Sequence, residues 1–384
     1  MYKVTEDQKE SLYHDGFVVL SNIVPEAATS AAKCTIYREL GSLRNASVQE
    51  SLNARAKESP ISQDGTERIQ QAALDTINTG TKEEIMSLVE PNSALQETIR
   101  TLLGPINPLS AGQVATSFPS PPDRQVNESG YPNNETPFFS WHGHLDGLWN
   151  GHTSIHQDLA NPMSAKQWEQ WFQDPARNGV SRKYPEFGTT IKNFTALLGI
   201  PLSDQTREGG GNLGLLRGAH HDIEAFFQHQ RNLGGPLGPD GPDWERFDNS
   251  APNKCGLRHY PERVREKFTQ GAEYTNDGRS WPRPTLVKTK PGDAILVLHS
   301  VPHCATRVST EDPRLMIYFR LTSANRPVGN ETIYPEALCD IWLEWDGMRD
   351  TVQRIREYSY LIPLDLRGEV KKIIRYVSPI IDYF

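Results

Sequence analysis

The sequence predicts a single, mainly β domain whose core is flanked by helices at both ends. Gly 29 and Pro 28 in 384 residues make the chain rich in turns, as expected for a β fold with long loops. Short apolar segments begin near residue 111 and continue to about 325. Helical patterns occupy about 1–110 and 326–384, and no linker or repeat interrupts the chain. We therefore expect one domain with an N-terminal helical layer, a β core and a C-terminal helical extension.

Local signals place the elements of the N-terminal layer. Thr5 and Gln8 have the spacing of a capping box, which predicts the start of a first helix. The apolar residues 17–20 predict a short strand, and the segment from Pro25 to about Leu40 predicts a second helix. Residues 82–103 predict one or two further helices that end at a Gly-Pro pair.

Short β-branched and apolar segments predict the strands of the core. They are residues 113–118, 138–147, 189–200, 212–216, 284–288, 294–298 and 315–322. Helices are expected after Ser164, over 223–231, near Tyr334 and over 345–358. The long polar segments 119–137 and 233–282 are loops and candidate lids, because loops of such length inside a domain usually serve function. We expect shortening of 233–282 to change turnover more than stability.

Composition excludes several classes of function. Lys+Arg 40 against Asp+Glu 48 gives a net charge of -8, which disfavours nucleic acid as a partner. No apolar run approaches the roughly 18 residues that a membrane span requires. The N-terminus has no secretory signal, and the four cysteines form no C-x-x-C pair, so we expect an intracellular, cytoplasmic protein. Both a monomer and a homodimer fit the sequence.

Two histidine clusters carry the strongest chemical signal. In the first, His144 and Asp146 alternate with Leu145, so on a strand both would point to one face. The second cluster includes His303, which follows the strand 294–298. An H-x-D pair joined by a distant histidine is the ligand set of non-haem Fe(II) oxygenases. A second H-x-D pair, His156 and Asp158, is the rival; we prefer the first because a glycine follows its Asp, which favours a strand end.

Ordered landmarks along the chain resemble the phytanoyl-CoA dioxygenase family of Fe(II)/2-oxoglutarate oxygenases. In this family a Pro-Gly-Asp turn leads into an apolar strand and the distal metal-binding histidine, as in residues 290–303 here. An arginine follows eleven residues later, which is Arg314. Residues 210–220, 144–147 and 15–20 match further family blocks, although Arg217 and Ala219 replace the usual Pro and Ser. The landmarks span about 6–325, with the long loops unmatched.

The resemblance implies a fold, a cofactor set and a reaction. The core would be a double-stranded β-helix, the jelly roll shared with cupins. His144, Asp146 and His303 would bind Fe(II), and Arg314 would bind the far carboxylate of the co-substrate 2-oxoglutarate. The reaction would consume O₂, release succinate and CO₂, and hydroxylate an unactivated C–H bond of a small molecule. The carboxylate of Asp146 speaks against a halogenase relative, where a small residue stands at that position.

Several other residues are rivals for these roles. Arg307 and Arg320 compete with Arg314, but Arg320 lies six residues further along the strand, about 20 Å away. His299 competes with His303, although its spacing to Arg314 would become fifteen. His220 is expected to be structural.

Weaker assignments concern the surroundings of the metal. Gln113 is a candidate contact of the metal-binding side chains or of 2-oxoglutarate, and Thr306 and Thr195 are candidate contacts of 2-oxoglutarate. Three aromatic residues could line a substrate pocket: Trp141, Trp149 and Phe194.

Two alternatives to the oxygenase remain open at this point. A cupin-like metalloenzyme without 2-oxoglutarate would keep the three metal ligands and would not need Arg314. A catalytically silent binding protein would keep only the fold, since fold alone does not determine function.

Overall fold

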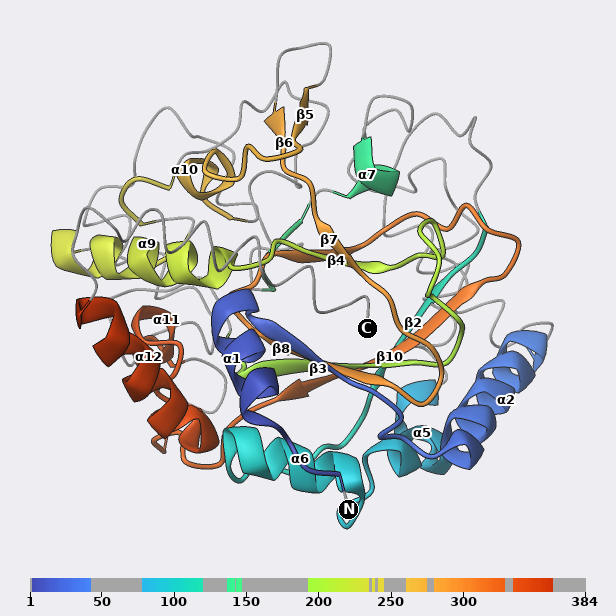
Figure 1. Ribbon diagram of the computed structural model, residues 1–384. Helices are drawn as coiled ribbons and strands as arrows, with labels where there is room; N and C mark the ends of the chain where they lie inside the picture. Colours follow the sequence, from blue (N-terminus) through green and yellow to red (C-terminus); the bar gives the residue numbers. More distant parts are fainter. Residues whose placement is uncertain are drawn as a thin grey trace, which may run out of the picture.

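Two antiparallel sheets form the centre of the molecule. The computed structural model describes residues 2–42, 78–119, 137–141, 143–146, 193–234, 237–238, 241–244, 260–274, 280–328 and 334–361. The larger sheet has the order β1-β8-β3-β10-β2, and the smaller has the order β7-β4-β9. The larger comprises β1 (Phe17–Leu20), β8 (Ala294–Leu298), β3 (Ala196–Pro201), β10 (Arg314–Leu321) and β2 (Gln113–Ser117). The smaller comprises β7 (Thr285–Val287), β4 (Leu213–Leu215) and β9 (His303–Ala305). Figure 1 shows β4 and β7 lying above β3 and β10.

Helices cover the larger sheet and one side of the molecule. Figure 1 places α5 and α6 below the larger sheet, α2 at the lower right, and α9, α11 and α12 at the left of the molecule. The N-terminal helices are α1 (Glu6–Asp15), α2 (Glu26–Ser42), η1 (Thr79–Thr81), α5 (Glu83–Met86), η2 (Ser87–Val89) and α6 (Ala94–Leu103). The later helices are α9 (Ala219–Leu233), α10 (Glu262–Arg265), α11 (Glu336–Cys339), η6 (Asp346–Met348) and α12 (Arg349–Leu361). None of the described helices is long and apolar enough to cross a membrane.

Local sequence signals determine the first two elements. The Thr5 hydroxyl accepts from the Gln8 backbone at 3.2 Å, and the Gln8 side chain accepts from the Thr5 backbone at 3.0 Å. The capping box is therefore confirmed, and Gly16 ends α1 with φ 82, a conformation that favours glycine. The chain then enters β1 at the predicted residues and pairs with β8.

The two faces of β10 have different chemistry. Leu315, Ile317, Phe319 and Leu321 are fully buried, as the period of two in a strand requires for a core face. The opposite face carries Arg314, Tyr318 and Arg320. β10 lies between β3 and β2 in the larger sheet, so the backbone of this strand is paired on both sides.

The structure corrects the prediction of a strand over 138–147. Residues Pro137–Ser140 form the short helix α7, in which Phe138 and Phe139 have φ near +54. Only a single bridge, between His144 and His303, follows in the described part of this segment. A second correction concerns His303, which does not end β8 but begins β9 in the other sheet. The turn over 299–302 carries the chain from one sheet to the other.

Parts of the segment 233–282 pack firmly on α9. Gln230 donates to the carbonyls of Gly238 and Pro242 and accepts from the Gly238 backbone. Trp244 lies against Phe226, and Tyr260 is fully buried. These described residues, with the small hairpin of β5 (Glu273–Tyr274) and β6 (Ser280–Trp281), belong to the folded body. The effect of shortening 233–282 on turnover therefore stays a prediction. The helix predicted after Ser164 lies outside the described residues.

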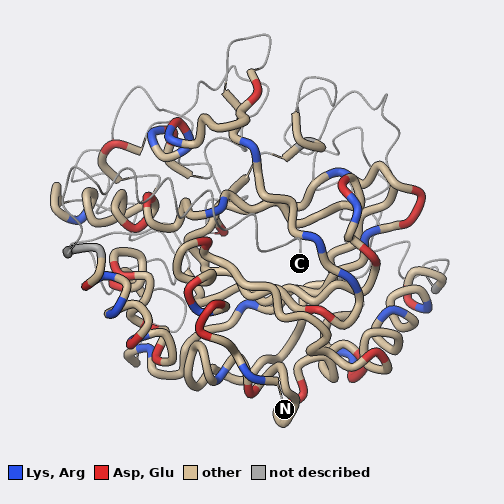
Figure 2. Tube along the Cα trace, viewed as in Figure 1, with Lys and Arg blue, Asp and Glu red and all other residues tan. Residues whose placement is uncertain are grey.

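Charges are distributed over the outside of the molecule. Figure 2 shows basic and acidic residues interspersed along α2 and α12, without a face of one sign in this view. Ion pairs join α12 to α1, for example Arg354 with Glu6 and Glu10. Exposed pairs of this kind contribute little to stability individually.

Candidate metal centre

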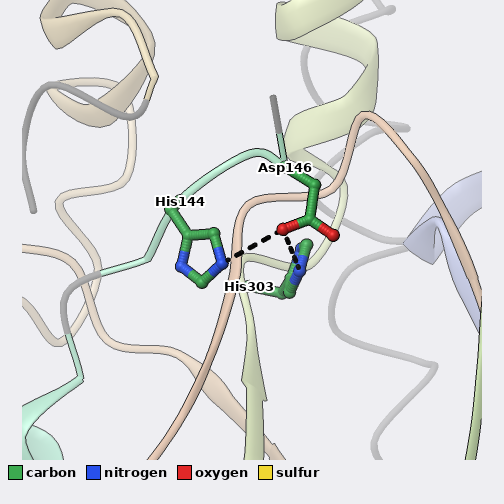
Figure 3. Close-up of side chains that lie close together, drawn as sticks. All are labelled: His144, Asp146 and His303. Atoms are coloured by element: carbon green, nitrogen blue, oxygen red, sulfur yellow. Dashed lines mark ion pairs between the residues drawn. The ribbon is translucent and has the colours of Figure 1, made fainter. Parts of the chain in front are cut away.

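Three side chains from two distant segments of the chain meet at one point. One ligand atom each of His144, Asp146 and His303 lies within 4.8 Å of the others. Asp146 Oδ1 is 3.5 Å from His144 Nε2 and 3.9 Å from His303 Nε2. Figure 3 shows both histidine rings beside the same carboxylate oxygen. This donor set, two imidazoles and one carboxylate, is compatible with a divalent metal ion.

Backbone pairing holds the two histidines together. The His144 N–H donates to the His303 carbonyl, and the His303 N–H donates to the His144 carbonyl, both at 2.9 Å. Residues that exchange both bonds in an antiparallel pair have neighbouring side chains on one face. The ring centroids are accordingly 4.7 Å apart. A single β-bridge therefore brings His144 beside His303, where the sequence had predicted a full strand.

A buried tryptophan supports this segment from the other side. Trp141 is fully buried, and its indole N–H donates to the Gly214 carbonyl at 2.9 Å. A Cβ on Gly143 would lie 2.6 Å from the Trp141 ring, and Gly143 has φ 64. Only glycine meets both conditions without strain. Trp141, predicted as a pocket wall, thus packs in the core beneath the residue that precedes His144.

The protonation pattern of His303 suits a metal ligand. Its Nδ1 lies 3.0 Å from the Val301 carbonyl. Because a carbonyl only accepts, Nδ1 carries the proton, and the lone pair of Nε2 is available to a metal ion. Burial, with the charge of His144, lowers the pKa of His303 to about 4. The ring is therefore neutral at physiological pH.

His144 and Asp146 form a charged pair when no metal is bound. Burial by itself would raise the pKa of Asp146, but the His144 hydrogen bond and nearby positive charges hold it well below its usual range. Burial opposes the charge on His144 too, yet Asp146 and Cys304 raise its pKa to about 10. A metal ion at this site would displace the His144 proton, because only the neutral ring binds metal.

Two residues that the sequence considered and set aside contact Asp146 directly. Arg320 was excluded as too distant from Arg314, yet it donates to Asp146 Oδ2 through Nε at 3.1 Å and Nη2 at 2.9 Å. His299 places its Nε2 3.1 Å from the Asp146 carbonyl. Burial lowers the pKa of His299 to about 4, so the neutral ring donates to that carbonyl. The six-residue spacing from Arg314 to Arg320 along β10 was correct. It could not show that the segment carrying Asp146 contacts Arg320 at the other end of the strand.

Arg314 lies at the opposite end of β10 and is almost completely buried. Its side chain packs on Gly211, where a Cβ would lie 2.6 Å from Arg314 Cδ. Arg314 Nη2 donates to the Tyr318 hydroxyl at 2.5 Å, and Nε has no hydrogen-bond partner among the described residues. No described carboxylate lies within ion-pair distance of the guanidinium. A buried cation without a counterion is costly, which indicates that an anion belongs there.

Tyr318 lies between Arg314 and Arg320 on the same face of β10. Burial raises the pKa of Tyr318, and the charges of Arg314 and Asp146 act on it in opposite directions. The hydroxyl therefore lies within electrostatic range of both the buried arginine and the metal-site carboxylate. Sequence reasoning missed this residue, although its position four residues after Arg314 places it on the same face of the strand.

The remaining predicted residues fall into three groups. Gln113 accepts from Arg320 Nη1 at 2.9 Å and so belongs to the surroundings of Asp146, and Phe194 lies beneath Arg320. The hydroxyls of Thr306 and Thr195 are used within the fold, by the Asn212 carbonyl and by Glu344. His220 is fully buried and donates to the Tyr13 carbonyl, as expected for a structural residue. Trp149, His156 and Asp158 lie outside the described residues.

Comparisons with known proteins give a distant structural likeness. No model of a known protein family and no curated protein matches the sequence. Solved structures that resemble the chain include the non-heme alpha ketoglutarate dependent carbocyclase SnoK from nogalamycin biosynthesis (10% identity, TM-score 0.37, 84% of this chain and 85% of that chain). HygX from Streptomyces hygroscopicus, with nickel and 2-oxoglutarate bound, has 14% identity and a TM-score of 0.34 over 84% and 88%. The non-heme monooxygenase ThoJ has 12% identity and a TM-score of 0.36 over 91% and 99%. Because these TM-scores lie below 0.5, the function must be argued from the site itself.

Proposed function

We propose that this protein is an Fe(II)- and 2-oxoglutarate-dependent dioxygenase, related to the phytanoyl-CoA dioxygenase family, that hydroxylates an unactivated C–H bond of a small molecule. One observation carries the proposal. Two histidine nitrogens and one carboxylate oxygen converge within 4.8 Å, on the side of the sheet that also carries a buried arginine without a counterion. The first half of this arrangement suits Fe(II), and the second half suits a dicarboxylate.

The ligand set fits the proposed metal. His144, Asp146 and His303 approach from the two paired segments, and all three ligand atoms face a common point. Two imidazoles and a carboxylate bind one face of Fe(II) and leave other positions for small ligands. The Val301 carbonyl fixes the His303 tautomer, as outer hydrogen bonds commonly do in metal sites.

Arg314 fits the far carboxylate of 2-oxoglutarate. Its planar fork can bind a carboxylate through two hydrogen bonds, and Nε is free to form one of them. The Tyr318 hydroxyl, already in contact with Nη2, stands beside the same position. An incoming carboxylate would neutralise the buried guanidinium.

Bound iron, with 2-oxoglutarate and O₂, supplies the oxidation, in which 2-oxoglutarate is converted to succinate and CO₂. The residues of this chain bind and orient the partners. His299 and Arg320 hold the backbone and side chain of Asp146, and Arg314 holds the co-substrate. His303 is buried and Asp146 is only 13% exposed, which limits the access of water to these two ligands and strengthens electrostatic interactions there.

The order of the strands supports a jelly-roll core. Along the chain, β2 belongs to the larger sheet, His144 pairs with the smaller one, β3 returns to the larger sheet, and β4 and β7 lie in the smaller. β8, β9 and β10 then alternate again between the sheets. Such alternation is expected of a double-stranded β-helix, with the flanking helices as parts of one domain over 1–384.

An anaerobic Fe(II) titration with and without 2-oxoglutarate tests the proposal. We expect a weak visible charge-transfer band that requires both metal and 2-oxoglutarate. His144→Ala should abolish the band and Arg314→Ala should weaken it. His229→Ala and Arg349→Ala, both at exposed surface ion pairs, are the matched controls and should leave it unchanged.

Two other results would contradict the proposal. Iron that binds without any band would indicate a metalloenzyme of the cupin type that does not use 2-oxoglutarate. A protein that binds no iron would indicate a silent binding protein on the same fold.

A further inference from the structure

The two oxygens of Asp146 face different partners. Oδ1 lies on the side of the histidines, 3.5 Å from His144 Nε2. Oδ2 accepts two N–H groups of Arg320, at 2.9 and 3.1 Å. The side chain of Asp146 is only 13% exposed, whereas that of Arg320 is 44% exposed. A half-exposed arginine thus reaches inward to one oxygen of a buried carboxylate.

Arg320 is itself held in place from two further directions. Its Nη1 donates to Gln113 Oε1 at 2.9 Å, and Gln113 lies on the neighbouring strand β2. Its guanidinium lies over the Phe194 ring, 5.6 Å from the centroid. The same ring forms an edge-to-face pair with His299, with the ring centroids 4.9 Å apart, and His299 donates to the Asp146 backbone carbonyl. Phe194 therefore supports both residues that fix Asp146.

We propose that Arg320 is a positioning residue for the metal centre. It holds Asp146 Oδ2 away from the histidines, so that the carboxylate offers a divalent metal ion Oδ1 alone. Without Arg320 the carboxylate could rotate and offer both oxygens, and the second oxygen would occupy a position that small ligands need. This inference rests on the proposed function, because it assigns Arg320 to the same metal site.

If Arg320 acted on the metal only through its charge, its removal would change metal affinity in the opposite direction. If Arg320 only competed with the cation for Asp146, its removal would strengthen metal binding. Because the guanidinium is exposed, solvent and salt screen its repulsion of the metal. The effect of Arg320 on the orientation of the Asp146 carboxylate should outweigh this repulsion, since the loss of an outer hydrogen-bond partner of a metal ligand commonly lowers metal affinity by about 10- to 100-fold.

Titration of the metal-free full chain with Co²⁺ distinguishes these cases. The visible absorption of bound Co²⁺ reports both affinity and coordination. We expect Arg320→Met to weaken Co²⁺ binding by about 10- to 100-fold and to alter the spectrum. Arg320→Lys should be intermediate, and the exposed surface arginine in Arg349→Met should be without effect. Thermal unfolding of the metal-free variants shows whether each one folds.

Gln113→Leu provides a second variant should Arg320→Met fail to fold. It leaves Arg320 in place but removes one of its contacts, so it should weaken Co²⁺ binding in the same direction and by less. Unchanged or tighter Co²⁺ binding with an unchanged spectrum, in a folded Arg320→Met protein, would overturn the inference alone. A wild-type protein without a Co²⁺ spectrum, or one whose spectrum survives His144→Ala, would overturn the proposed function and this inference with it.

Discussion

The two ends of β10 carry the same residue type in opposite states. Arg314, at the start of the strand, is buried, and its Nε has no partner among the described residues. Arg320, near the end, is half exposed and is bound to Asp146 and Gln113. Both project from the same face of one strand, six residues apart. The difference indicates that the buried arginine needs a ligand from outside, whereas the exposed arginine already serves a residue of the protein.

Replacement of Arg314 should produce the largest effect. Arg314→Met removes the proposed carboxylate anchor, so 2-oxoglutarate affinity should fall on the order of 100-fold, the loss of about 3 kcal/mol in charge-assisted hydrogen bonds. The metal-free protein should be as stable as wild type or more so, because a buried cation without a counterion is gone. Calorimetric titration of the Co²⁺-loaded protein and thermal unfolding measure the two quantities. Unchanged 2-oxoglutarate affinity, or a strongly destabilised protein, would contradict the interpretation that the buried Arg314 needs a ligand from outside.

A methyl group at Gly143 should disturb the Arg320 end and spare the Arg314 end. The added Cβ would lie 2.6 Å from Trp141 at a residue with φ 64, so Gly143→Ala should cost about 2–3 kcal/mol of unfolding free energy. Metal affinity should fall because His144 and Asp146 follow this residue directly. Denaturant unfolding and Co²⁺ titration test both effects. Gly234→Ala is a control with open space at a similar φ of +69, and it should lose stability only.

Buried histidines, His220 among them, should make the stability of the metal-free protein depend on pH. Burial, with the charge of His221, lowers the pKa of His220 well below its usual value. Since the unfolded chain binds a proton near pH 6.5 and the folded chain does not, stability is lost as pH falls below that value. A single such group costs about 1.4 kcal/mol per pH unit. His220→Gln in the metal-free protein should therefore unfold with a shallower pH dependence between 6.5 and about 5. Identical slopes would contradict a buried neutral His220.

The contact between Gln113 and Arg320 should give the smallest effect. If both act on Asp146 through one chain of hydrogen bonds, Gln113→Leu should weaken Co²⁺ binding only a few-fold, on the order of 1 kcal/mol or less. In the Arg320→Met background the same change should have no further effect, since its partner is already absent. Additive losses in the double variant would show that the two residues act independently.

Local signals predicted the elements that depend on neighbours in sequence. The capping box of Thr5 and Gln8 and the strand Phe17–Leu20 are found at the predicted residues. The capping box depends on contacts between residues only three positions apart.

The failures all involve contacts between distant segments. The segment that carries His144 was predicted to be a strand. Instead, the backbone turns at Phe138 and Phe139, and His144 then forms a single β-bridge with His303. Arg320 and Asp146 are 174 residues apart in sequence, so no local spacing could reveal their contact. Tertiary pairing, rather than residue propensity, therefore decides the surroundings of the candidate metal centre.

The most direct test of the account is the position of a bound metal ion. In crystals of the protein loaded with Mn²⁺, an anomalous difference map should contain one peak in contact with His144 Nε2, Asp146 Oδ1 and His303 Nε2. Arg320 should remain on Asp146 Oδ2. A peak bound by other residues, or metal-soaked crystals without a peak at these three side chains, would contradict the central claim.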